Sequence, residues 1–377
     1  MKEKKVIILH EYGAPSHYIG LESFLDNSPI YENPQYKEFS ILRRYLRSFK
    51  DMNFSLFIKT TKNMLWLVYS FLYPRTNSGK IVILGMAPLD WRVIILSRVL
   101  KFSTVIYHSS WTDWSGNNYP KRNYFFKKKI EKKWRYFLSA QAKAIACVTS
   151  ITCNEILNFT ANECLATTKV VYHSFNDNFL KVDVDKQHLN SNGDTLNIIF
   201  VGRLVRQKGI DKIIELSEIF PNHNFTLVGD GELYKELKHL NKGNVFLKGF
   251  VSSKDELMTL CAEHDVILLP SLRIDGWEEL FGISLIEAMA AGCVPLVTDH
   301  MGPKEILCSD KLLEEFIFKE ENYVNDAACY IDKFAKNKKY LVDMKLASIK
   351  CARRFSLEEI GARWESIFHF LAKKTKD

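Results

Sequence analysis

The sequence lacks a hydrophobic run long enough to span a membrane. A transmembrane helix needs about 20 mainly apolar residues, whereas the apolar segment 64–73 has ten. The run at 6–9, which follows a charged start, is also too short for a signal peptide. We therefore expect a globular, cytoplasmic protein.

Cysteine pairs, low-complexity segments and internal repeats are also missing. The eight cysteines stand singly, with no C-x-x-C pair and no metal-ligand spacing. Several, such as Cys147 and Cys293, lie in apolar runs, which indicates reduced thiols in a core. We expect no metal and no cofactor. The sequence also lacks a nucleic-acid-binding motif, so no nucleic-acid partner is expected.

The composition is otherwise ordinary for a globular chain, with 47% hydrophobic and 25% charged residues. A length of 377 residues indicates two domains at roughly 150 residues per domain. Positive charge is concentrated in the first half, because residues 1–180 contain 25 Lys or Arg and 13 Asp or Glu. This asymmetry indicates that the first half faces an anionic surface.

Residues 265–292 predict a strand, a loop and a helix. The run 265–271 is apolar throughout, as is typical of strands buried on both faces of a sheet. The helix is expected to begin near Gly282 or Ile283 and to end at a Gly292 cap. The N–H groups at such a helix start favour phosphate, and Gly282 permits close approach of a ligand.

Two carboxylates flank this predicted anion site. Glu279 lies in the loop, and Glu287 lies about 6–8 Å further along the helix at 1.5 Å per residue. A carboxylate on each side of a phosphate site suits a ligand with hydroxyl groups on both sides of a diphosphate. A nucleotide-sugar is such a ligand.

The stretch from Glu279 to Glu287, followed by Ala-Met-Ala-Ala-Gly at 288–292, resembles the E-x7-E signature of retaining family 4 glycosyltransferases. Residues 202–209 similarly resemble the G-R-L-x-x-x-K-G element of that family. The resemblance implies the GT-B fold, an α/β architecture of two Rossmann-like, doubly wound parallel-sheet domains with the donor in the interdomain cleft. The alternation of predicted strands and helices also favours parallel sheets.

The resemblance implies roles for individual residues. Arg203 and Lys208 would contact the donor diphosphate and stabilise the leaving group without a metal ion. Glu279 would hold sugar hydroxyls, and Glu287 would hold the ribose. The remaining donor contacts would come from backbone and loop positions: Gly13, Gly202, Gly229, Asp230, Phe250, Val251, Phe281, Gly282 and Ile283.

His108 falls at the end of a predicted strand at 104–108, where α/β sheets bind ligands. Family members often carry a histidine here, so the resemblance implies that His108 faces the donor sugar near the reacting carbon. In the polar, aromatic loop that follows, Trp111, Asp113 and Trp114 are candidate acceptor contacts. Tryptophan rings stack on sugar faces, but packing explains these two rings equally well. The Gly13 loop is equally consistent with an ordinary turn.

Residues 121–138 predict an amphipathic, strongly basic helix. One face carries the apolar residues Phe126, Ile130, Trp134 and Phe137, and basic residues occupy the rest. Such a helix fits an anionic membrane surface. The alternative is the solvated face of a core helix.

Two further segments predict helices. In 39–50 apolar residues recur at helical spacing with arginines between them, and 64–73 predicts a buried helix or, alternatively, a membrane-dipping one. Residues 90–101 predict a helix whose inward residues are Trp91, Ile94, Ile95, Val99 and Leu100.

The predicted domains are an acceptor-binding domain at 1–182, a linker at 183–194, a donor-binding domain at 195–355, and a helix at 356–377 that returns to the first domain. The implied activity is transfer of a sugar from a UDP- or GDP-sugar to a hydroxyl of a glycan acceptor, with retention of configuration. Front-face displacement is favoured, with Glu279 as nucleophile the alternative.

The basic, aromatic first half indicates a lipid-linked acceptor at the inner face of the cytoplasmic membrane, as in O-antigen or other surface polysaccharide assembly. Two alternatives remain open. The chain is either a non-catalytic membrane- or nucleic-acid-binding protein on this scaffold, or an epimerase or phosphorylase of the same fold.

Overall fold

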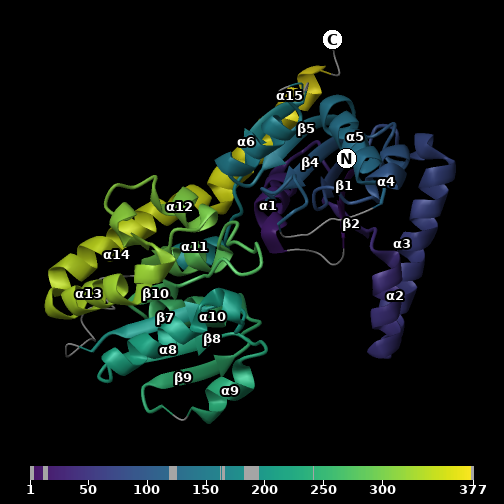
Figure 1. Cartoon of the computed structure of the whole chain (residues 1–377). Coiled ribbons are helices and arrows are strands. Elements are labelled where there is room, and N and C mark those ends of the chain that lie inside the picture. Colours follow the sequence, from purple (N-terminus) through teal and green to yellow (C-terminus); the bar gives the residue numbers. More distant parts are fainter. Residues whose placement is uncertain are drawn as a thin grey trace. The chain divides into compact units, whose positions relative to one another are not determined.

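The computed structural model describes residues 4–11, 16–118, 125–161, 163, 166–181, 195–240 and 242–374. The chain forms two compact units (Figure 1). The first comprises Met1–Tyr172 with Ile360–Asp377, and the second comprises His173–Glu359. The unit boundaries thus fall at 172 and 359, whereas the sequence placed them near 182 and 355. The predicted linker, 183–194, lies outside the described residues.

The first unit contains a six-stranded parallel sheet in the order β2-β1-β3-β4-β5-β6. The chain order reverses between β1 and β3, which makes this edge a switch point where doubly wound sheets bind ligands. The strands are β1 (Val6–His10), β2 (Gln35–Glu38), β3 (Ile81–Gly85), β4 (Thr104–Ser109), β5 (Ala142–Cys147) and β6 (Thr167–Val170).

Both faces of this sheet are covered. Successive side chains of a strand point to opposite faces, so in β1 Ile7 and Leu9 join one core while Val6 and Ile8 join the other. The helices that supply these cores and the rest of the unit are α1 (Ile19–Asn27), α2 (Ile41–Lys50), α3 (Phe54–Leu72), α4 (Val93–Val99), α5 (Lys127–Tyr136), α6 (Ser150–Phe159) and α15 (Leu357–Lys374).

The second unit contains a six-stranded parallel sheet in the order β12-β11-β10-β7-β8-β9. This is the Rossmann order, with its switch point between β7 and β10. The strands are β7 (Asn197–Val201), β8 (Asn224–Val228), β9 (Val245–Gly249), β10 (Val266–Leu269), β11 (Val294–Thr298) and β12 (Ile317–Phe318).

Helices cover this sheet in two groups. Helices α10, α11 and α14 pack together, and α8 packs against α13. The helix bounds are α8 (Ile210–Ile219), α9 (Tyr234–His239), α10 (Lys254–Ala262), α11 (Ile283–Ala290), α12 (Met301–Leu307), α13 (Tyr323–Lys336) and α14 (Lys338–Ala352). The topology confirms the predicted fold class of two Rossmann-like domains.

Two strands, β2 and β12, were not predicted. Both lie at sheet edges, and β2 has the polar sequence Gln-Tyr-Lys-Glu. An edge strand has a neighbour on one side only and can face solvent, so it need not be apolar. A hydrophobicity pattern therefore overlooks it.

Two predictions about buried helix faces were wrong. In α3 the buried side chains are Thr60, Asn63 and Ser70, while most apolar side chains of the segment 64–73 are exposed. In α4 the prediction was wrong in part: Trp91 before the helix and Ile94 and Ile95 within it are exposed, because Val93 and Leu96 form the inward face. Val99 and Leu100 are buried, as predicted.

The basic segment 121–138 has its apolar face in the protein core. Within the described residues from 125 onward it forms α5, and Ile130, Trp134 and Phe137 belong to the core beneath the sheet. Only Phe126 of the predicted face is exposed. The core-helix alternative therefore accounts for most of this face. None of the helices in the described part of the chain combines the length and hydrophobicity that crossing a membrane requires.

Candidate functional site

The carboxyl ends of β7, β8, β9 and β10 lie side by side in the second sheet. The loops that follow these strands contain Gly202 and Arg203, Gly229 and Asp230, Phe250 and Val251, and the segment 270–282. The switch point between β7 and β10 therefore brings most of the predicted donor contacts to one edge.

Glycines let the backbones of these loops touch. A Cβ atom at Gly209 would lie 1.9 Å from the carbonyl oxygen of Pro270, and one at Gly229 would lie 1.8 Å from that of Gly202. Both glycines also have positive φ angles, 65° and 143°. The loop after β7 is therefore held against the loop after β10 on one side and the loop after β8 on the other.

Lys208 and Glu279 form an ion pair across the switch point, between their Nζ and Oε2 atoms. Each side chain is only 12–13% exposed. The Ser271 hydroxyl donates a hydrogen bond of 3.2 Å to the same carboxylate oxygen. The Lys208 ammonium also lies 5.2 Å from the ring centre of Trp277, which faces it as an aromatic partner.

His300 fixes the backbone of Glu279 and requires a neutral ring. Its Nδ1 accepts the Glu279 N–H at 3.0 Å, so its Nε2 must carry the proton that it donates to the Ser271 carbonyl at 2.8 Å. Burial, followed by the charge of Arg273, lowers the pKa of His300. The neutral tautomer therefore holds the Glu279 loop at neutral pH.

Arg273 orders the outer part of the same loop. Its guanidinium contacts Asp299 at 3.0 Å, Glu320 at 2.7 Å and Glu278 at 3.1 Å. The Glu278 carboxylate in turn accepts the Met301 N–H at the start of α12. Three carboxylates and one guanidinium thus tie the loop to β11 and α12 before any ligand binds.

Helix α11 begins and ends where the sequence predicted. It runs from Ile283, after Gly282 with φ of 109°, to Ala290, and Gly292 follows in the left-handed conformation. The N–H groups of its first turn have no acceptor within the helix, and they lie at the end that follows the loop after β10.

Glu287 is buried in α11 and pairs with Lys254 at the start of α10. Burial raises the pKa of Glu287, although Lys254 favours the charged form. Lys254 is 47% exposed, so the pair has a buried anionic end and a solvent-facing cationic end. The sequence analysis did not identify Lys254, because nothing in its local pattern marks it.

The other predicted donor residues differ in exposure. Arg203, Asp230 and Phe250 are exposed, and within the described ranges Arg203 makes no ion pair. Phe281 is buried, with its ring against His173 and Phe355. A role for Phe281 therefore rests on its backbone rather than on its side chain.

In the first unit, His108 lies in an aromatic cluster at the end of β4. Its Nδ1 is 3.2 Å from the Tyr18 hydroxyl, and its ring is 5.7 Å from the rings of His17 and Trp364. Burial, then His17 and His10, lowers the pKa of His108. The His108 ring is therefore neutral, which suits a hydrogen-bonding role better than a charged one.

The predicted acceptor contacts separate into two kinds. Trp111 and Asp113 are partly exposed, and the Asp113 carboxylate accepts N–H groups from Ser115 and Asn118, so it builds the loop. Trp114 is 6% exposed and packs on Tyr107, Trp134 and Phe159. Packing, the alternative that the sequence left open, therefore accounts for Trp114. Gly13 lies outside the described residues.

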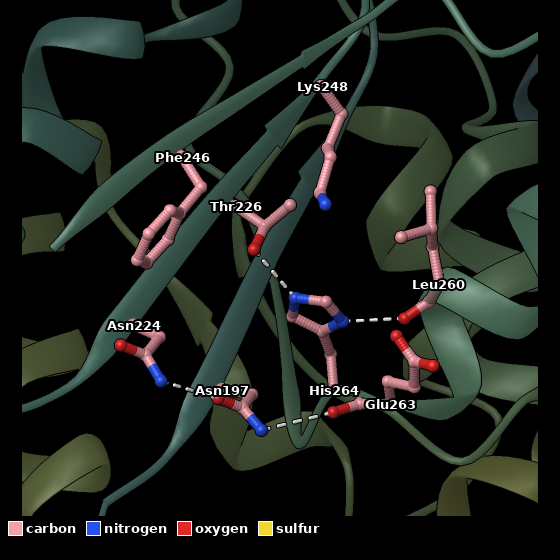
Figure 2. A pocket seen from close by; sticks show the side chains of 8 residues that line it. All are labelled: Asn197, Asn224, Thr226, Phe246, Lys248, Leu260, Glu263 and His264. Atoms are coloured by element: carbon pink, nitrogen blue, oxygen red, sulfur yellow. Dashed lines mark hydrogen bonds between the residues drawn. The ribbon is translucent and has the colours of Figure 1, made fainter.

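A cavity of about 220 Å³ lies away from these loops (Figure 2). Its walls include Asn197 and Asn224, the first residues of β7 and β8, so it opens at the amino ends of the strands. His264 donates from Nδ1 to the Leu260 carbonyl at 2.5 Å and accepts from the Thr226 hydroxyl at 2.8 Å. These satisfied contacts indicate a structural role. In the described residues no group of three or more His, Cys, Asp or Glu side chains is arranged to hold a metal ion.

Sequence reasoning missed His300, Ser271, Tyr18 and Lys254. None of them belongs to a motif, and each reaches its partner through the fold. For His300, the only local signal is its position shortly after the apolar run 293–297, at the edge where ligands bind.

Residues 181–350 match the family model described as glycosyl transferases group 1. An uncharacterized 41.2 kDa protein in the cps region of Klebsiella pneumoniae is 31% identical over 134 residues, which are 35% of each chain. The amylovoran biosynthesis glycosyltransferase AmsK of Erwinia amylovora is 34% identical over 122 residues, 30% of each chain. The matched segment thus spans about a third of these two relatives.

Over nearly its whole length, the chain resembles a crystal structure of HepE from Anabaena in complex with UDP. The TM-score is 0.67 at 14% identity, with 98% of this chain and 100% of that chain covered. At this identity the likeness concerns the fold, which is GT-B. The match to the group 1 glycosyl transferase model is confined to residues 181–350.

Proposed function

We propose that the protein is a retaining glycosyltransferase of family 4 that moves a sugar from a UDP- or GDP-sugar to a hydroxyl of a glycan acceptor. The observation that carries the proposal is the largely buried Lys208–Glu279 pair at the switch point, with exposed Arg203 in the same loop as Lys208. In this proposal, Lys208 and Arg203 supply positive charge to a diphosphate, and the neighbouring Glu279 carboxylate accepts hydrogen bonds from sugar hydroxyls.

The chemistry requires a leaving nucleotide whose negative charge grows as the glycosidic bond breaks. Lys208 and Arg203 stabilise that charge, so the reaction needs no metal ion. Amides at the start of α11 add donors to the phosphates. Glu279, oriented through its backbone by His300, accepts hydrogen bonds from the donor sugar. Glu287 holds the ribose.

Retention follows from displacement on the face that the nucleotide leaves. The leaving phosphate takes the proton of the acceptor hydroxyl, and the new bond forms on the same side. This path is favoured because the other carboxylates at this loop, Glu278, Asp299 and Glu320, are engaged by Arg273, which leaves no clear second carboxylate to act with Glu279 in a double displacement. The role of His108, facing the donor sugar, remains a prediction from the resemblance.

The acceptor class rests on the relatives and on charge. One relative is named for amylovoran biosynthesis and another for a cps region, and the first half of this chain has an excess of basic residues. A lipid-linked glycan at the inner face of the cytoplasmic membrane fits both. We therefore propose a role in surface polysaccharide or lipopolysaccharide assembly, with peripheral association with an anionic membrane.

Calorimetric titration with a panel of nucleotide-sugars tests the donor site. We expect one base and sugar to bind, and Lys208→Ala to weaken its binding at least about tenfold because a buried charge-assisted contact is lost. Lys238→Ala, which replaces an exposed lysine on α9, should bind the nucleotide-sugar like the wild type. If no nucleotide-sugar binds, the chain is not a transferase of this kind, and a non-catalytic binding protein becomes the better description.

Product analysis tests the reaction. Incubation with the donor found by titration and a glycan acceptor should yield a glycoside with retained anomeric configuration, and excess chelator should leave the rate unchanged. Inversion, or loss of activity with chelator, would contradict the mechanism.

A further inference from the structure

The α2–α3 hairpin lies at one edge of the first unit (Figure 1), and many of its large apolar side chains are exposed. Twelve of the 26 exposed large hydrophobic side chains in the described part of the chain lie between residues 42 and 73. Leu42 is 75% exposed, Phe54 74% and Met52, at the turn, 92%. A concentration of exposed apolar surface in one short segment marks an interaction site rather than ordinary surface.

These side chains form continuous stripes along the helices. On α2, Leu42, Leu46 and Phe49 recur at spacings of four and three. On α3 the exposed apolar residues also recur at helical spacing and lie on one face of the helix. They are Phe54, Ile58, Leu65, Val68 and Leu72. A stripe of this kind presents a single apolar face to a partner.

The hairpin is nevertheless well formed. Asn53 caps α3 by accepting the Leu56 N–H at 2.9 Å. Between the helices, the Tyr45 hydroxyl is 2.9 Å from that of Thr61, and Phe57 packs on Tyr45 with ring centres 5.2 Å apart. The outer face is therefore held in place by polar and aromatic contacts on the inner side.

The charge beside this face is almost entirely positive. Residues 39–75 contain seven Arg or Lys and a single acid, Asp51. Arg43 and Arg47 lie next to Leu42 and Leu46 in the sequence. Their side chains are 71% and 64% exposed, and they contact the carboxylates of Glu11 at 4.0 Å and Asp51 at 3.2 Å at the surface. Within the same unit, α3 contacts α4. The side chains of Ile94 and Ile95 on α4, and of Trp91 just before it, are also exposed.

We propose that the α2–α3 hairpin is the surface by which the protein docks on an anionic lipid bilayer. Its apolar stripe enters the boundary between headgroups and acyl chains, while the flanking arginines and lysines contact anionic headgroups. An amphipathic face of leucine and phenylalanine bordered by basic residues is typical of helices that lie along such a surface.

A second copy of the chain is a poorer occupant of this face. Two identical hairpins would bring six cations against six, and on each side Asp51, with Glu11 and Glu38 from outside the hairpin, offsets only part of that charge. Like charges facing each other oppose association, whereas anionic headgroups complement them. The proposal moves the membrane contact from α5, whose apolar face lies in the core, to the hairpin.

This inference deepens the membrane part of the proposed function, and its test uses no donor and no acceptor. Vesicle binding and sugar transfer can thus each fail while the other holds. The assay is flotation of the full chain with vesicles of phosphatidylcholine containing about 30% phosphatidylglycerol, compared with vesicles of phosphatidylcholine alone. We expect binding to the anionic vesicles and at least about tenfold weaker binding to the neutral ones.

Two sets of variants separate the apolar and the charged contributions. Leu46→Ser with Phe49→Ser should lower the partition coefficient at least about tenfold through lost apolar burial. Arg43→Gln with Arg47→Gln should lower it by about the same factor and reduce its salt dependence. The matched control, Ile219→Ser with Leu346→Ser, changes two exposed apolar residues of the second unit and should bind like the wild type.

Three outcomes would overturn the proposal. They are equal binding to neutral and anionic vesicles, unchanged binding of the Leu46–Phe49 variant, and a vesicle-free dimer in sedimentation that this variant dissociates. The last result would identify a second copy as the occupant. Circular dichroism and thermal unfolding verify that each variant is folded.

Discussion

The donor loops of the second unit and the α2–α3 hairpin of the first unit place their charged and apolar side chains differently. At the switch point, charged groups are drawn inward and paired, as Lys208 is with Glu279. In the hairpin, threonine, asparagine and serine are inside α3 while leucine and phenylalanine are outside. Buried, oriented charges suit a polar ligand that replaces water, whereas exposed apolar side chains suit a partner that is itself apolar. The difference separates a chemical site from a docking surface.

Because the donor loops are tightly packed, we expect the largest effect from a glycine-to-alanine substitution that adds one methyl group between them. Gly209→Ala would place a Cβ 1.9 Å from the Pro270 carbonyl oxygen at a positive φ angle. We expect a loss of about 2–4 kcal/mol in unfolding free energy and a severe loss of turnover. Denaturant unfolding and a transfer assay measure the two. Gly243→Ala, where a Cβ meets nothing within 4 Å, is the control, and equal behaviour of both variants would show that the loops are not closely packed.

Removing the exposed cation of the same loop should act on chemistry rather than on stability. Arg203→Ala should lower turnover at least about a hundredfold, because the charge on the leaving diphosphate loses a partner. Its melting temperature should remain that of the wild type. Arg206→Ala changes a neighbouring exposed arginine and serves as the control. Unchanged turnover in Arg203→Ala would remove this residue from the donor site.

The buried carboxylate of α11 should affect donor affinity alone. Glu287→Gln keeps the shape of the side chain but weakens the hydrogen bonds that it accepts from ribose hydroxyls. We expect donor affinity to fall about tenfold, since hydrogen bonds to a charged group contribute about 1.5–3 kcal/mol. Calorimetry measures the affinity. A variant with full affinity but low stability would make Glu287 a structural partner of Lys254 instead.

The histidine cluster of the first unit predicts a pH dependence of stability. Burial, followed by the charge of His10, lowers the pKa of His17 to about 3, whereas an unfolded histidine titrates near pH 6.5. Below about pH 6.5 the unfolded state therefore binds more protons, and stability falls as the pH drops toward 3. The slope from His17 is at most about 1.4 kcal/mol per pH unit.

Denaturant unfolding at pH 7, 6 and 5 measures this slope. His17→Gln should be less sensitive to acid than the wild type while matching its response above pH 7. A variant with the wild-type slope would show that folding does not lower the pKa of His17.

The hairpin should tolerate what the donor loops do not. Leu42→Ser replaces a side chain that is mostly in solvent, so its unfolding free energy should change by less than about 0.5 kcal/mol. The buried Leu96→Ser on α4 provides the contrast, with an expected loss of several kcal/mol from its core site. A large loss in Leu42→Ser would mean that this face is packed within the protein and is not a docking surface.

Much of the fold could be predicted from local patterns. The strands at 81–85, 104–109 and 266–269 are apolar runs of typical length, and the bounds of α11 follow from Gly282 and Gly292. The pattern failed where burial was partial. Helix α3 has apolar residues on most of its circumference, so its sequence does not show which of them face the sheet.

The candidate site was predicted in part. Arg203, Lys208, Glu279 and Glu287 belong to motifs that are continuous in the sequence. Their partners Lys254 and His300 do not belong to such motifs and have no local sequence signature. They reach the site only because the fold places α10 and β11 beside α11 and the loop after β10. Trp114 is the opposite case. Its aromatic loop suggested a surface on which a sugar stacks, but its ring is buried in the core of the first unit.

The sequence by itself determined the alternation of strands and helices, the glycines at close approaches and the four charged residues of the donor motifs, because each depends on residues near one another in the chain. Only the tertiary structure decided which charges meet. Lys208 reaches Glu279 across 71 residues and His108 reaches Tyr18 across 90. It also decided that α3 turns its apolar face outward. Such contacts depend on the order in which parallel strands are placed in a sheet, and that order is set by long-range packing rather than by any local pattern.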